Sequence, residues 1–172
     1  MLIADGKVEV DKATNAGATP LISAAMNGRA EIVKLLITDG KAEVDKANKN
    51  GATPLYWATE FGCTEVVELL ITDGKAEVDK ADNNGCTPLY NAAYKGNTEI
   101  VKLLITDGKA AVDKAKNDGW TPLIVATSEG RTEVVKLLVT GGADVNIVVQ
   151  GYTPLKLAKE MGHQAIVALL EQ

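Results

Sequence analysis

Apolar and polar positions along this chain follow a pattern that recurs about every 34 residues. Each period holds a short apolar segment such as "TPLISAAM", a denser one such as "EIVKLLIT", and a polar stretch rich in Gly, Asp, Lys and Asn. The apolar segments have the spacing of short helices, and the polar stretch has the composition of a loop. A Thr-Pro pair opens each period, at residues 19–20, 53–54, 87–88, 121–122 and 153–154, in steps of 34, 34, 34 and 32 residues. This self-similarity predicts a solenoid of stacked repeats.

The ends of the two helices in each period are also marked. Thr is expected to cap the first helix, with Pro at its first position, where the missing N–H costs nothing. A glycine that tolerates a left-handed backbone is expected to end it, at Gly28, Gly62, Gly96, Gly130 and Gly162. The second helix carries Glu in its first turn, near the positive end of the helix dipole. Its apolar run, such as residues 32–36, is too dense for a surface helix and predicts burial between units.

The motifs "G-x-TPL-x-x-A-A", "EIVKLL" and "GADVN" resemble those of the ankyrin repeat family over essentially the whole chain. The resemblance implies an all-α repeat solenoid of stacked helix-turn-helix ankyrin repeats with hairpin-like loops, elongated and curved. Two departures are visible. The position of the family's His after Thr-Pro-Leu is taken by Ile22, Tyr56, Tyr90, Ile124 and Lys156. Most units also have "DGKAEVD" where the family more often has Gly-Ala directly, which adds one residue between helix and loop.

We expect one ankyrin-repeat domain over residues 1–172, divided into a partial repeat (1–16) and units 17–50, 51–84, 85–118, 119–150 and 151–172. Residues 2–17 align with residues 36–51, so the chain begins inside the second helix of a repeat. This favours a fragment of a longer array over a natural truncated start. It predicts a monomer with an uncapped N-terminal end, through which self-association is possible. Weaker packing support is expected in the first full unit, at Leu21, Ile22, Ile32 and Leu36.

Composition and charge narrow the functions to consider. The net charge of −5 argues against nucleic acid as a partner, because phosphate binding needs a basic surface. The sequence has no leader pattern and no run of 18 apolar residues, so we expect neither secretion nor a membrane partner. Two cysteines, Cys63 and Cys86, are too few for a disulfide framework. An intracellular, cytoplasmic location is the simplest interpretation.

The residues needed for an enzyme site are missing from the pattern. His163 is the only histidine, and both cysteines lie two or more units away from it along a linear stack. One His and two Cys do not make the usual structural zinc site, and no phosphate-binding glycine loop is present. The repeated carboxylates Asp39, Glu43 and Asp45, with lysines between them, are expected to form a solvated face. We therefore expect no catalysis, no metal and no cofactor.

Because the units are near copies, the positions that vary stand out, and the aromatic residues gather between the turn and the end of the first helix. The family resemblance implies a concave surface, made of hairpin tips and first helices, that binds protein partners. Carried over position by position, it selects Tyr56, Phe61, Tyr90, Tyr94, Trp120 and Tyr152. Packing alternatives remain open for some of them. Trp57 is favoured as a core residue, Tyr56 and Tyr90 are as readily half-buried as exposed, and Trp120 can instead pack against the neighbouring hairpin tip.

A further expectation concerns Asn146 in "LVTGGADVN". It occupies the loop position that asparaginyl hydroxylases modify in some ankyrin proteins, so the resemblance implies a possible hydroxylation site. For the chain as a whole, a protein–protein interaction module is the first hypothesis. The alternatives are a structural spacer or an engineered, consensus-like scaffold with no partner of its own, and the repeat fragment of a larger multidomain protein.

Overall fold

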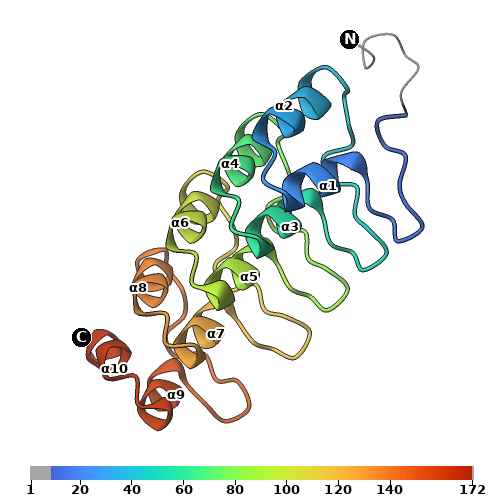
Figure 1. Cartoon of the computed structure of the whole chain (residues 1–172). Coiled ribbons are helices and arrows are strands. Elements are labelled where there is room, and N and C mark those ends of the chain that lie inside the picture. Colours follow the sequence, from blue (N-terminus) through green and yellow to red (C-terminus); the bar gives the residue numbers. More distant parts are fainter. Residues whose placement is uncertain (1–8, 172) are drawn as a thin grey trace.

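The computed structural model describes residues 9–171 and contains ten helices in that range. They come in pairs: α1 and α2 (Pro20–Met26, Ala30–Thr38), α3 and α4 (Pro54–Glu60, Thr64–Thr72), α5 and α6 (Pro88–Lys95, Thr98–Thr106), α7 and α8 (Pro122–Ser128, Thr132–Thr140), and α9 and α10 (Pro154–Met161, Gln164–Leu170). The first helices of the pairs stack in one row and the second helices in another (Figure 1). The predicted all-α repeat solenoid is confirmed.

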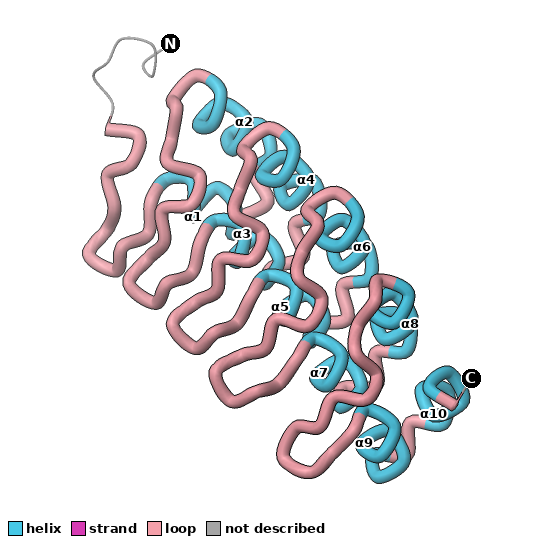
Figure 2. Tube along the Cα trace, turned by 180° about the vertical axis from the view of Figure 1, so that it is seen from behind, coloured by secondary structure: helices cyan, strands magenta, loops and turns pink. Residues whose placement is uncertain are grey.

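Long loops join the pairs and project from the row of first helices like fingers (Figure 2). Each doubles back in a hairpin-like course, but no extended strand forms within residues 9–171. The β-pairing in that range consists of one isolated antiparallel bridge, between Val149 and Tyr152. The loop tips, here called fingertips, are residues 48–52, 82–86, 116–120 and 149–152. The partial repeat expected over residues 1–16 falls partly outside the described residues, and its described part is loop.

Local sequence signals set the helix starts as predicted. The hydroxyl oxygen of Thr19 accepts a hydrogen bond from the backbone N–H of Ile22 at 3.1 Å, and the four equivalent threonines cap α3, α5, α7 and α9 in the same way. The glycines after the first helices all have a left-handed backbone. Only Gly96 and Gly162 are the capping residues themselves; α1, α3 and α7 end one residue earlier, at caps Asn27, Phe61 and Glu129.

The core is built mainly from the small and aliphatic residues that the composition offers. The dense second helices are buried between units as predicted, except in α2, where Ile32 is 49% exposed while its equivalent Ile100 is 1% exposed. The expected weaker support in the first unit is therefore confined to Ile32, because Leu21, Ile22 and Leu36 are buried.

The extra residue between helix and loop has a conformational cost. Lys41, Lys75 and Lys109 adopt left-handed φ values of 51°, 55° and 53°. In the fourth unit, which lacks that residue, Gly142 takes the same place with φ 92°. Lysine is strained in this region and glycine is not.

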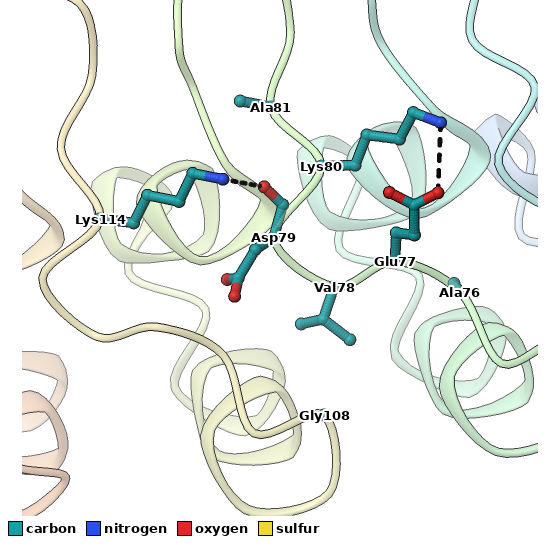
Figure 3. A pocket seen from close by; sticks show the side chains of 8 residues that line it. All are labelled: Ala76, Glu77, Val78, Asp79, Lys80, Ala81, Gly108 and Lys114. Carbon is teal, nitrogen blue, oxygen red and sulfur yellow. Dashed lines mark hydrogen bonds and ion pairs between the residues drawn. The ribbon is translucent and has the colours of Figure 1, made fainter.

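Neighbouring loops are joined by a carboxylate ladder, which corrects the expectation of a purely solvated charged face. Asp11, Asp45, Asp79 and Asp113 each accept the backbone N–H of the next loop, for example Asp45 Oδ1 from Glu77 at 3.0 Å. At Asp79 a lysine strengthens the link between loops: Figure 3 shows Lys114 Nζ donating to the Asp79 carbonyl at 2.8 Å, with the Lys80–Glu77 ion pair at 3.5 Å beside it. Burial raises the pKa of Asp45, and the Glu77 N–H opposes that effect. Asp39 and Glu43 are exposed as expected.

Candidate protein-binding face

The surface formed by the fingertips and the exposed side of the first helices is here called the inner face. It carries the two most exposed aromatic side chains, Phe61 at 55% and Tyr94 at 45%, one at the end of α3 and one near the end of α5. Phe61 stacks on Trp57, one turn earlier, with ring centroids 5.9 Å apart and an interplanar angle of 19°. Between the two helices, Lys95 and Glu60 form an ion pair at 2.7 Å.

Tyr56 and Tyr90, which stand where the family has His, are half-buried. The Tyr56 ring meets the Trp57 ring edge to face at 5.8 Å. Tyr90 packs against the core, with Lys116 Nζ 5.9 Å from its ring centroid. Burial raises the pKa of Tyr56 to about 12, with further contributions from Asp82, Cys86 and Glu60. Burial also raises the pKa of Tyr90, while Lys116 opposes it. Both side chains thus combine packing with a partly accessible ring.

Trp120 and Tyr152 lie at fingertips as expected, and both are half-buried. Trp120 contacts the main core and also a small cluster of Ile124, Val149 and Leu157, against which Tyr152 packs as well. Lys156 Nζ lies 4.7 Å from the Tyr152 ring centroid. The packing of Trp120 matches the alternative that it leans on neighbouring residues, so its role in partner binding stays a prediction.

Two exposed aliphatic side chains, not predicted as binding residues, accompany the aromatic ones. Met161 is 52% exposed at the position equivalent to Phe61, and Val148 is 65% exposed beside the last fingertip. The variation between repeats marks both positions, provided that aliphatic residues are counted as well.

Trp57, expected in the core, is half-buried, and its indole Nε1 is enclosed with no hydrogen-bond partner among the residues that the structure describes.

In the last three repeats the residue after the helix-ending glycine binds the preceding repeat, an arrangement that the sequence did not indicate. Asn97 Nδ2 donates to the Thr59 carbonyl at 3.3 Å, and Arg131 Nε to the Tyr94 carbonyl at 3.3 Å. His163 Nε2 lies 3.0 Å from the Ser128 carbonyl, which can only accept, so this nitrogen carries the proton. The single histidine is thereby engaged in a contact between repeats.

Neither cysteine has the surroundings of a reactive thiol. Burial raises the pKa of Cys63 and raises that of Cys86 to about 11, the latter with help from Asp82. The nucleophilic thiolate is therefore disfavoured at neutral pH.

Within residues 9–171, no group of three or more His, Cys, Asp or Glu side chains is placed to hold a metal ion. In the same range no helix is long and apolar enough to cross a membrane.

Asn146 is exposed in the last long loop, and its backbone N–H donates to Asp144 Oδ1 at 2.9 Å. The four aspartates at its position in the other loops use their carboxylates in the ladder between repeats. The Asn146 side-chain amide has no partner in the part of the chain that the structure describes. Its hydroxylation stays a prediction.

Comparison with known proteins agrees with the geometry. No curated protein matches the chain. A family model described as ankyrin repeats (3 copies) matches residues 1–82 and again residues 72–149. These matches cover most of the sequence and the first four helix pairs, whose capping threonines and stacked rows are described above. The chain therefore belongs to the ankyrin repeat family.

Proposed function

We propose that this chain is a non-catalytic module that binds a protein partner through its inner face. Ankyrin repeats generally act as protein–protein interaction modules, and the family is generally non-catalytic. The observation that carries the proposal is the exposure of Phe61 and Tyr94 on neighbouring first helices. The partner is a protein in the same intracellular compartment rather than nucleic acid or a membrane, in keeping with the acidic net charge of −5. We take the chain to be a monomer.

Physical chemistry supports a recognition role for these side chains. Aromatic residues are among those that dominate binding energy at protein interfaces, because they bury a large apolar area with few rotatable bonds. The equivalent positions in other repeats hold Asn27, Lys95 and Glu129 in place of Phe61, and Met26, Glu60, Ser128 and Glu160 in place of Tyr94. The fold thus accepts polar side chains at both places, so packing alone does not require aromatic ones.

The test compares affinity capture from a lysate by the intact chain and by a Phe61→Ala/Tyr94→Ala variant, with bound proteins quantified by mass spectrometry. Ile32→Ala is the matched control, because it also removes an exposed apolar side chain, but from the second-helix row. Trp120 is left intact since it packs against two clusters. We expect proteins captured by the intact chain and the control to be lost from the double variant, with helical circular dichroism unchanged in all three.

Equal capture by all three chains would contradict the proposal. It would favour the alternative, a spacer or consensus-like scaffold, which is motivated by the identical segments 37–47 and 71–81.

A further inference from the structure

A small hollow of about 220 Å³ lies between two neighbouring fingertips on the inner face. Its lining comes from Tyr56 and Trp57 of α3, from Asn50 in the fingertip before them, and from Asp82 and Asn84 in the next fingertip. The Tyr56 and Trp57 rings stand edge to face, with an interplanar angle of 86°. The hollow therefore brings together aromatic rings, one carboxylate and amide groups.

In the other repeats, the equivalent pair of facing residues shows which side chains pack together at this position. The first residue of each fingertip donates its backbone N–H across the tip, as Asp82 does to the Cys86 carbonyl at 3.0 Å and Lys116 to the Trp120 carbonyl at 2.8 Å. The equivalent residues at this position are Asn48, Asp82, Lys116 and Val149. On the preceding first helix the facing positions are Ile22, Tyr56, Tyr90 and Ile124. Val149 and Ile124 form an apolar pair. Lys116 places its ammonium group over the Tyr90 ring.

Tyr56 is equivalent to Tyr90, whose ring has the Lys116 ammonium group over it. The residue that faces Tyr56, however, is the acidic Asp82. Asp82 makes no ion pair within residues 9–171; its Oδ1 accepts the backbone N–H groups of Asn84 and Cys86, at 2.9 and 2.8 Å, and its Oδ2 accepts from Asn84 Nδ2 at 3.3 Å. The raised pKa of Tyr56 reflects burial first and then this negative charge. Ring faces beside an unpaired carboxylate attract cations, through the ring quadrupole and through charge-assisted hydrogen bonds.

We propose that this hollow receives the charged end of a Lys or Arg side chain of the protein partner, a refinement that rests on the proposed function. The partner's cation takes the role at Tyr56 that Lys116 has at Tyr90. Trp57 connects the hollow to exposed Phe61 through the stacked ring pair. The matching partner segment therefore carries a basic residue close to an apolar one.

The chain itself supplies a conservative variant. Asn48 Oδ1 accepts the N–H groups of Asn50 and Ala52, at 2.9 and 3.1 Å, just as Asp82 accepts those of its own fingertip. Asp82→Asn therefore keeps the two backbone hydrogen bonds of the fingertip; besides the charge, it removes only the 3.3 Å hydrogen bond that Asp82 Oδ2 accepts from Asn84 Nδ2. Asp73→Asn makes the same charge change at the C-terminal end of α4, in the second-helix row, and serves as the control.

The experiment selects peptides that bind the intact chain from a random displayed library and measures their dissociation constants by fluorescence anisotropy. We expect the selected peptides to share a Lys or Arg. Asp82→Asn should weaken their binding about tenfold, and Asp73→Asn should leave it unchanged. Replacing the peptide's basic residue with Gln should abolish the difference between the intact chain and Asp82→Asn.

The outcomes separate the two proposals. Peptides without a basic residue, or equal losses for Asp82→Asn and Asp73→Asn, would overturn the cation site. If binding is still lost in Phe61→Ala/Tyr94→Ala, the inner face remains the binding surface without that site. A library that yields no binder dependent on Phe61 or Tyr94 would contradict both proposals.

Discussion

Thr59 and Thr127 occupy the same buried position of the repeat, yet only one of their hydroxyl groups is satisfied among the residues that the structure describes. Thr59 Oγ1 donates to the Tyr56 carbonyl at 2.7 Å and accepts from Asn91 Nδ2 at 3.4 Å. Thr127 Oγ1 is buried without a partner. A buried polar group without a hydrogen bond destabilises the folded state.

We expect Thr127→Val to raise the free energy of unfolding by about 1 kcal/mol, because it replaces the unsatisfied hydroxyl with a methyl group of similar size. Thr59→Val is the matched control. It should lower that free energy by about 1–2 kcal/mol, since it removes one hydrogen bond and leaves the buried Asn91 amide without its acceptor. Urea unfolding followed by circular dichroism measures both. Destabilisation of similar size in the two variants would contradict the assignment.

At the scale of elements, three junctions of the stack have a hydrogen bond from the residue that precedes a second helix to the first helix of the preceding repeat. Asn97, Arg131 and His163 make this contact. Cys63, at the same position, lies against Gly28 at the end of α1, but within residues 9–171 its Sγ hydrogen-bonds only to the Phe61 carbonyl of its own repeat, at 3.8 Å. The junction between the first two helix pairs therefore lacks a bond that the later junctions have.

Cys63→Asn should supply that bond, from the new side-chain amide to the carbonyl of Ala25. We expect a gain of about 1 kcal/mol in the free energy of unfolding, the usual net value of one hydrogen bond. The reverse change, Asn97→Cys, should lose a similar amount. Chemical denaturation under reducing conditions compares the two variants with the intact chain. A loss of stability in Cys63→Asn would show that the first junction cannot accept the geometry of the third repeat.

At the scale of the whole molecule, the same type of side chain contributes differently to the free energy of unfolding, depending on its place in the stack. Ile32 and Ile100 are equivalent, but only Ile100 is covered by neighbouring helices. In a repeat array each unit is stabilised chiefly by its contacts with adjacent units.

Ile100→Ala should therefore lower the free energy of unfolding by about 3 kcal/mol, within the range for truncating a buried Ile. Ile32→Ala should cost less than about 1 kcal/mol, because much of the side chain is already in contact with solvent. Equilibrium unfolding at several protein concentrations checks the pair and also detects association through the surface around Ile32. Equal costs at all concentrations would mean that Ile32 is covered in solution.

The period, the helix pairs and the helix starts could be predicted from the sequence alone. These features depend on contacts three or four residues apart, such as Thr19 with Ile22, and on backbone preferences of Pro and Gly. The sequence also pointed to Phe61 and Tyr94, because near-identical repeats reveal their variable positions. Three features appear only in the folded chain: Trp120 packs between two clusters, Asp45 accepts a hydrogen bond from the next loop, and Asp82 faces Tyr56. Those relations join residues of different repeats or opposite ends of one repeat, so they arise only when the chain is folded and stacked.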